Sequence, residues 1–341
     1  MRDIESLKEA TEVLNEFERR TNTLLMIDGT TLDIMLSDLN LENKFLTAAT
    51  QAPSVCVCRC SPTQKAIITS KIGAFTGKRT AAVGDGGNDV GMILEANVGI
   101  GVVGKEGKQA SLASDFSIDE FKYLRRLILW HGRLSYKRSA VLSQFVIHRG
   151  LIISIIQAIF SITFYFVAIP IYNGMLILGY STVYTSLPVF SLVFDHDVSV
   201  ETCMKYPPLY ATLQKGRSLS RKTFLIWFFK SIFQGCVIML GTLIFFNESF
   251  TNIVTITFSA LIMTELLNVY SSVHHLNYRI LCASVLTLFV YILSIALLPQ
   301  YFDVSYITWI FVAKVSCVTL ASWLPLHIIG VIVEKMDPSE F

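Results

Sequence analysis

The sequence is poor in charge, and its few charged residues are unevenly distributed. Only 16% of its 341 residues are Asp, Glu, Lys or Arg, and the net charge is +2. So small a net charge does not suggest a nucleic-acid-binding surface. The first residues, MRDIESLKEA, mix acids with bases and lack the apolar core of a signal peptide, so we expect a cytosolic N-terminus. The seven cysteines do not have the spacing of a secreted disulfide framework.

The chain divides into a polar and an apolar half. Residues 1–139 are charged and mixed, whereas long apolar runs dominate from Ala140 to Val333. An apolar run of about 20 residues is long enough to cross the hydrocarbon core of a bilayer. We therefore predict a cytosolic domain over residues 1–139, a membrane domain over 140–335 and a cytosolic tail over 336–341.

Short apolar runs alternate with helical patterns in the polar half. We expect a helix at Ile4–Arg20, and residues 116–139 read as a basic helix that leads to the membrane. The alternation elsewhere predicts an α/β fold with a parallel sheet, whose chemistry lies at the carboxyl ends of the strands. The expected strands are Leu24–Ile27, Ser54–Cys60, Thr80–Val83 and Val98–Val103, the expected helices are Pro62–Ile72 and Val90–Ala96, and Asp28–Gly29 is read as a turn.

Six apolar spans are expected in the second half. The loop Asp195–Thr223 contains five Lys or Arg residues, whereas the turns at Pro170, Asn247–Asn252 and Pro299–Ser305 contain none. By the positive-inside rule the basic loop and both termini are cytosolic. The spans lie near Val141–Ile169, Ile171–Phe194, Phe224–Phe246, Ile253–Val273, Ile280–Leu298 and Ile307–Val333.

A glycine-rich acidic loop follows the third expected strand. In GDGGND, Asp85 and Asp89 flank a glycine turn, and Mg²⁺ prefers such carboxylate ligands together with phosphate and water. Asn88 could donate to a phosphate oxygen, and Lys65 lies near a helix N-terminus, where a phosphoryl group is readily held. The alternatives are a solvated Asp/Asn/Gly turn and a surface lysine.

These residues belong to longer motifs that carry a family resemblance. CSPTQK at 60–65 and GDGGNDV at 84–90 resemble the last two catalytic motifs of the haloacid-dehalogenase fold in P-type ATPases. GKEGKQA at 104–110, ASDFS at 113–117 and HGRLSY at 131–136 resemble the type IV branch, the phospholipid flippases. Gly87, Lys108 and YKRS at 136–139 resemble its class 2 group of endosomal and Golgi flippases.

The resemblance implies a fold, a reaction and roles for the loop residues. The fold would be a partial haloacid-dehalogenase-like α/β phosphorylation domain followed by an all-α bundle of six transmembrane helices. Asp85 and Asp89 would form the Mg²⁺ site, Asn88 and Asp89 would order the phosphate, and Lys65 would contact the phosphoryl group. The activity would be ATP-driven movement of aminophospholipids from the lumenal to the cytosolic leaflet of Golgi, trans-Golgi or endosomal membranes. The resemblance does not decide whether a partner subunit is needed.

Several parts of a complete pump are absent from the sequence. The phosphorylation motif DKTGT does not occur. Four further spans, an actuator domain and an ATP-binding domain are also lacking, so we expect no turnover by this chain alone. A cation pump is disfavoured because the spans lack several carboxylates. A second alternative is a non-catalytic chain that assembles or competes with full-length flippases.

Charged and polar side chains at membrane depth are functional candidates because they are costly to bury. We assign His148, Arg149 and Gln157 in the first span to the lipid path, because related flippases carry a basic residue there. Three others are read as structural: Lys230 and Lys314 as snorkelling side chains and Glu265 as part of an interhelical pair.

Three further patterns are read as structural. Gly99–Gly104 matches G-x-G-x-x-G, but its glycines lie inside an expected strand, so it is not a dinucleotide site. Cys56, Cys58 and Cys60 have no nearby histidine to complete a metal site. Asp195–Asp197 is expected to cap a span at the water interface, and His274 to be solvated.

Overall fold

The computed structural model describes residues 7–18, 23–104, 108–214, 219–245, 250–275, 277–298, 301–302 and 309–336. The chain forms two compact units, Met1–Arg125 and Arg126–Phe341. Some predicted features lie outside the described residues: the first turn of the N-terminal helix, Lys215 and Arg217 of the basic loop, turn residues 247–249, and tail residues 337–341.

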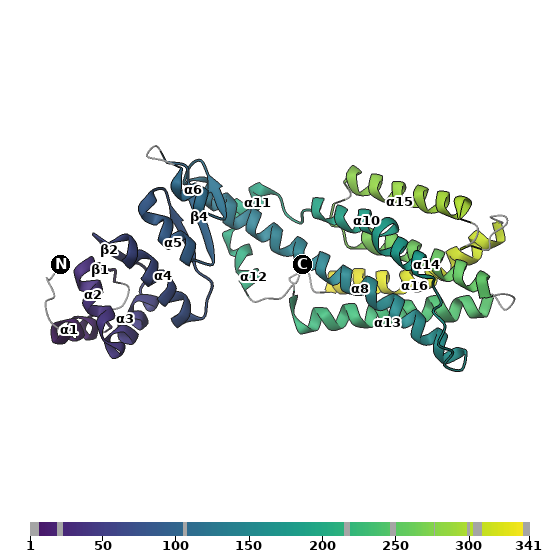
Figure 1. The fold of residues 1–341 in the computed structure, drawn as a ribbon, viewed down its shortest axis with the longest axis horizontal. Coiled ribbons are helices and arrows are strands. Elements are labelled where there is room, and N and C mark those ends of the chain that lie inside the picture. The colour runs from purple at the N-terminus through teal and green to yellow at the C-terminus, as the bar shows by residue number, and fades with distance from the viewer. Residues whose placement is uncertain are drawn as a thin grey trace. The chain divides into compact units, whose positions relative to one another are not determined.

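The first unit is an α/β fold whose short strands are all parallel (Figure 1). Its helices are α1 (Leu7–Glu18), α2 (Gly29–Ser37), α3 (Leu39–Gln51), α4 (Pro62–Thr76), η1 (Gly87–Asp89), α5 (Val90–Glu95), α6 (Gln109–Ala113) and α7 (Tyr123–Arg126). Its strands are β1 (Leu25–Asp28), β2 (Val55–Cys58), β3 (Ala81–Gly84), β4 (Val98–Val102) and β5 (Phe116–Ile118).

The strands form two sheets, which corrects the expectation of one. β1 pairs with β2, and β3, β4 and β5 pair in that order. Helix α4 joins β2 to β3, so this crossover connects strands that do not pair with each other. Among the described residues, β2 and β3 therefore each keep one edge without a strand partner. The β–α–β rhythm correctly indicates parallel strands, but it does not say which strands are adjacent.

Two segments differ from their predicted structure. Asp28 does not form a turn but caps α2, because its Oδ1 atom accepts a hydrogen bond from the Thr31 backbone at 2.9 Å. The expected helix over residues 116–139 instead begins with a strand, β5, which pairs with β4 through Ile100 and Phe116. Strand β5 has only three residues, too few to show an alternating pattern in the sequence.

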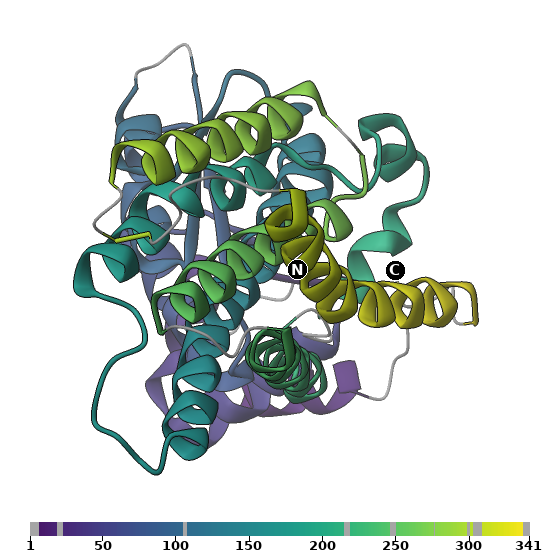
Figure 2. The same cartoon turned by 90° about the vertical axis from the view of Figure 1, so that its right-hand side faces the viewer.

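The second unit is all-helical, and six helices in its described part are long and apolar enough to cross a membrane, as predicted (Figures 1 and 2). Helix α14 lies at the centre, packed against α10, α13 and α16. In its most apolar 18-residue stretch, 78% of the residues are buried. The helices are η2 (Leu127–Gly132), α8 (Arg133–Thr163), α9 (Gly174–Gly179), η3 (Tyr180–Tyr184), α10 (Ser186–Ser191), η4 (Leu192–Phe194), α11 (Val200–Lys205), η5 (Pro207–Tyr210), α12 (Ala211–Gln214), α13 (Arg221–Phe245), α14 (Phe250–Ser271), α15 (Tyr278–Leu297) and α16 (Trp309–Met336).

The second span is interrupted by a wide π-turn. Segment η3 lies between α9 and α10, so the ordinary helical hydrogen bonds are broken there. The Thr185 hydroxyl donates to the Tyr180 carbonyl at 2.5 Å, and the Ser186 hydroxyl donates to the Ser181 carbonyl at 2.6 Å. These side chains provide hydrogen bonds to carbonyl groups of the π-turn, where water inside a membrane would not be available.

Candidate functional site

The glycine-rich loop and the CSPTQK segment lie side by side in the first unit. The Lys65 Nζ atom on α4 is 2.7 Å from Asp89 Oδ1 in η1, although the two residues are 24 positions apart. Helix α4 starts as predicted, with Pro62 in its first turn and a capping box in which Ser61 and Gln64 bond each other's backbone N–H groups. The capping box fixes the first turn of α4, from which Lys65 reaches Asp89 of the GDGGND loop.

Glycine at position 84 allows the loop to close on itself. A Cβ atom there would overlap the side chain of Asp89, so only glycine permits this approach. The Asp89 Oδ2 atom also accepts a long hydrogen bond from the Asp85 backbone N–H at 3.4 Å. Strand β3 thus ends in a turn that holds Asp89 half-buried against Lys65.

Asp85 and Asn88 are exposed on the same loop. Among the described residues, their side chains have no hydrogen-bond partner, which leaves the Asp85 carboxylate free to accept a cation. The described residues contain no group of three or more His, Cys, Asp or Glu side chains that could hold a metal. Mg²⁺ commonly takes only one or two carboxylates and fills its other positions with phosphate and water, so Asp85 and Asp89 fit this ion.

Asp28 caps a helix beside the CSPTQK segment. Hydrogen bonds from Thr31 and Thr30 lower the pKa of its carboxyl to about 2. The neighbouring Gly29 carbonyl accepts from the Gln64 side chain at 2.8 Å, and a Cβ at Gly29 would lie 2.6 Å from the Arg59 carbonyl. Glycine is therefore needed where these two loops meet.

The glycines of the G-x-G-x-x-G pattern lie under helices. A Cβ at Gly99 would meet Ile93 of α5 at 2.6 Å, and one at Gly101 would meet Ser111 of α6 at 2.5 Å. Both residues belong to β4, as expected, and their lack of a side chain allows helices to pack closely on the strand.

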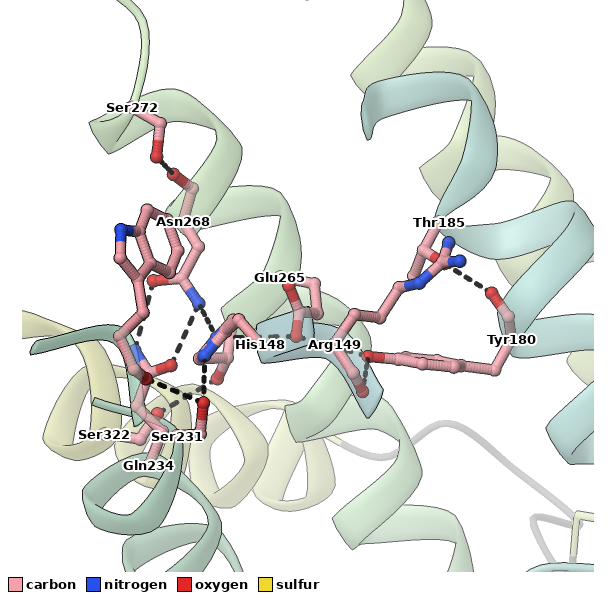
Figure 3. A network of polar contacts seen from close by, with 12 residues as sticks. His148, Arg149, Tyr180, Thr185, Ser231, Gln234, Glu265, Asn268, Ser272 and Ser322 are labelled. Carbon is pink, nitrogen blue, oxygen red and sulfur yellow. Dashed lines mark hydrogen bonds and ion pairs between the residues drawn. The ribbon is translucent and has the colours of Figure 1, made fainter. Parts of the chain in front are cut away.

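A buried polar network joins three membrane helices in the second unit (Figure 3). His148 on α8 is 0% exposed; its Nδ1 atom is 2.6 Å from Ser231 Oγ on α13, and its Nε2 atom is 3.2 Å from Asn268 Nδ2 on α14. Asn268 and Gln234 exchange two amide hydrogen bonds of 3.0 and 3.1 Å. Gln234 and Asn268 were not among the predicted site residues, although an amide in an apolar span is the signal that could have indicated them.

Arg149 points to a different group of residues from its neighbour His148. Its Nη1 atom donates to Thr185 Oγ1 at 2.8 Å and to the Ser181 carbonyl at 3.3 Å, so it contacts the η3 π-turn. Tyr180 of the same turn donates to Glu265 Oε1 at 3.2 Å. The residue predicted for headgroup contact therefore lies beside a break in the second span (Figure 3).

Gln157 lies apart from both, two turns further along α8. Its side chain bonds the backbone of Ile169 and Ile171, at 3.1 and 2.8 Å, and so holds the turn between the first two spans. It also lines a cavity of about 510 Å³ together with Ser154 and Ser161. The three predicted lipid-path residues thus occupy three different surroundings.

Known proteins resemble the chain along its whole length. Residues 111–337 match the family described as "Phospholipid-translocating P-type ATPase C-terminal". The chain is 51% identical over 341 residues to the probable phospholipid-transporting ATPase IIB of Bos taurus, and these cover 100% of the chain and 30% of that protein. It is 47% identical over 341 residues to the probable phospholipid-transporting ATPase tat-5 of Caenorhabditis elegans, covering 99% of the chain and 32% of that protein.

The same likeness extends to yeast. The chain is 46% identical over 324 residues to the phospholipid-transporting ATPase NEO1 of Saccharomyces cerevisiae, covering 94% of the chain and 28% of that protein. It therefore spans about 30% of the length of the curated relatives that it matches. With its six apolar helices and its matched C-terminal region, this chain belongs to the phospholipid-translocating P-type ATPase family.

Proposed function

We propose that this chain is the C-terminal part of an ATP-driven phospholipid flippase that works through an aspartyl-phosphate. The observation that carries the proposal is the contact of Lys65 with Asp89 at the carboxyl end of β3. A lysine, two carboxylates and an amide gathered at one strand end form the surroundings that a phosphoryl group and Mg²⁺ require.

The unpaired edges of β2 and β3 could receive a further strand that carries the phosphorylated aspartate. Helix α4 contains several apolar residues but buries none of them, and Ile67 and Phe75 remain 40% and 41% exposed. A strand inserted between β2 and β3 would cover this helix and complete one sheet. Its carboxyl end would then lie beside Lys65 and the GDGGND loop, where a phosphorylated aspartate is needed.

The loop residues have separate roles in this proposal. Lys65 neutralises and orients the phosphoryl group, Asn88 donates to one of its oxygens, and Asp89 holds Lys65 in place. Asp85 and Asp89 hold Mg²⁺, which would neutralise charge on the phosphoryl oxygens when bound. ATP would bind to a domain outside this chain.

The membrane part would carry the lipid. We propose aminophospholipid movement from the lumenal to the cytosolic leaflet of Golgi or endosomal membranes, with both termini cytosolic, as the motif resemblance implies. Arg149 would meet the anionic headgroup, His148 would hold the helix behind it, and Gln157 would shape the lumenal end. Each role is supported by the position of the residue on α8.

A second candidate is a non-catalytic chain that assembles or competes with full-length flippases. The two candidates share a fold but differ in one respect: only the first requires the GDGGND loop to work.

A chimera separates the two. The C-terminal 30% of the Bos taurus relative is replaced by this chain, and inward movement of labelled aminophospholipid is measured in cells. We expect transport, its loss in Asp85→Asn, and its retention in Asp119→Asn, an exposed control in the same unit. A chimera that reaches the membrane in normal amount but moves no lipid would contradict the flippase proposal.

A further inference from the structure

Glu265 is a carboxyl group at the centre of the membrane bundle. It lies on α14, the most buried span, and is 2% exposed. Its Oε1 atom accepts from the Tyr180 hydroxyl at 3.2 Å, and that hydroxyl also lies 3.4 Å from the Arg149 carbonyl. Its Oε2 atom is buried and, among the described residues, has no hydrogen-bond partner.

These contacts are too few for an ionised carboxylate. A carboxylate offers about four acceptor sites, and here one shared hydroxyl proton serves them. A buried charge is tolerated only when it is paired and its remaining lone pairs are satisfied. A neutral carboxylic acid does not carry this penalty.

His148, the nearest basic group, does not provide a partner. Its Nε2 atom is 3.7 Å from Glu265 Oε1, beyond hydrogen-bond distance. With the Ser231 hydroxyl donating to the Trp227 carbonyl at 2.9 Å, His148 Nδ1 donates to Ser231. Nε2 then accepts from Asn268 and carries no proton. In this arrangement His148 is neutral and offers Glu265 neither a proton nor a positive charge.

Among the described residues, neither Arg149 nor Lys230 forms a hydrogen bond or ion pair with Glu265. Arg149 on α8 bonds Thr185 and Ser181. Lys230 on α13 lies 4.6 Å over the ring of Trp227. The basic residues of α15 and α16 with described contacts lie against other groups: Arg279 on Phe194, Lys314 on the Phe245 carbonyl and His327 on Ser271. The Tyr291 hydroxyl on α15 is 2.7 Å from Ser259 Oγ.

We propose that Glu265 is a proton-binding site inside the bilayer and holds its proton in this conformation. The ligand is H⁺, bound to a carboxylate oxygen to give the neutral acid and released from it to water when the site opens. Asn268, His148 and Tyr180 fix the surroundings of the acid without supplying a positive charge to ionise it. The site thus differs from an ion pair, which the sequence alone suggests for this position.

The proton affects Arg149. An ionised Glu265 would offset the positive charge of Arg149, whereas the neutral acid leaves that charge available to an anionic phosphate. This consequence rests on the proposed function; the proton site itself does not. Proton release from Glu265 would then weaken the hold of Arg149 on a headgroup.

Infrared spectroscopy of this chain in lipid tests the site directly. At neutral pH we expect the C=O stretch of a protonated carboxylic acid, which should disappear in Glu265→Gln. The matched control is Glu201→Gln, since Glu201 is exposed on α11 and should be ionised at this pH. The wild-type band should also fade as the pH is raised, a measurement that needs no variant.

Two results would overturn the proposal: no protonated carboxyl band in the wild type at neutral pH, or an unchanged band in Glu265→Gln. A second arm uses the chimera described above. Lipid-stimulated ATP hydrolysis should fall at alkaline pH in the parent but not in Glu265→Gln, which stays neutral. An identical alkaline loss in both proteins would refute the link to Arg149, whereas an inactive parent would refute only the flippase proposal.

Discussion

At the scale of single residues, Arg149 is a positive charge within the first span that contacts the π-turn of the second span. Its guanidinium contacts a carbonyl and a hydroxyl of the η3 region through one nitrogen, Nη1. The planar fork of arginine can bind a phosphate with its remaining donors, which a lysine cannot imitate. The alternative is that Arg149 only anchors α8.

The substitution Arg149→Lys distinguishes these roles in the chimera. Hydrogen bonds to charged groups contribute about 1.5–3 kcal/mol, so loss of the fork should lower lipid-stimulated dephosphorylation by about tenfold or more. Arg149→Ala should lower it further. Arg279→Lys is the matched control, because Arg279 stacks on Phe194 outside the polar network. Normal stimulation in both Arg149 variants would leave only the anchoring role.

At the scale of elements, Asp195 ties the turn after the second span to the turn after the fourth. Burial raises the pKa of Asp195, but hydrogen bonds from the His274 ring and from the backbone of His274 and His275 outweigh it and lower the pKa to about 2. The same hydrogen bond raises the pKa of His274 against the effect of burial. His274 is exposed, as expected, and its Nδ1 atom also lies 3.0 Å from Asp195 Oδ2.

This pair predicts a pH dependence of stability. The pKa of His274 is higher in the folded chain than its ordinary value of 6.5, so its stabilising effect is complete below that value. The effect should be lost as the pH rises through the raised pKa. Thermal unfolding in detergent should therefore show a midpoint that falls as the pH rises above 6.5. Asp195→Asn should flatten this slope, and an unchanged slope would contradict the assignment; Asp119→Asn should keep it.

The turns between spans also carry the topology prediction. Tyr165 is 93% exposed in the turn after α8, and Tyr206 is 53% exposed in the basic loop. With the exposed Cys282 and Cys317 replaced by serine, Tyr165→Cys should react with an impermeant reagent only from the lumenal side. Tyr206→Cys should react only from the cytosolic side. Labelling of both from one side would refute the predicted orientation.

At the scale of the whole molecule, the proposed phosphate site lacks the DKTGT aspartate. In our proposal Lys65, Asp85 and Asp89 would position a phosphoryl group but would not form the covalent intermediate. We therefore expect that the purified chain, with Mg²⁺ and ATP, releases no phosphate above background. Phosphate release that Asp85→Asn removes would show that this expectation is wrong.

Much of the architecture follows from local sequence. Six runs of about 20 apolar residues predict six spans because the bilayer sets that length. Ser61, Pro62 and Gln64 predict the start of α4 because capping bonds involve neighbours in sequence. Gly84 likewise indicates the GDGGND turn, because a Cβ atom there would overlap the side chain of Asp89. These features depend on interactions within a few residues.

Other features depend on contacts between distant residues. Lys65 meets Asp89 across 24 positions, and Asn268 meets His148 across 120. Hydropathy does not distinguish a span that faces lipid from one at the centre of a bundle, since both are apolar, so the central place of α14 could not be predicted. The separation of the strands into two sheets could not be predicted either, because strand order depends on which strands pair and not on their order in the chain. The sequence alone determined which segments form long apolar helices and where the glycine-rich acidic loop lies. Only the tertiary structure decided which polar groups share one buried space, because burial depends on neighbours that the local sequence does not contain.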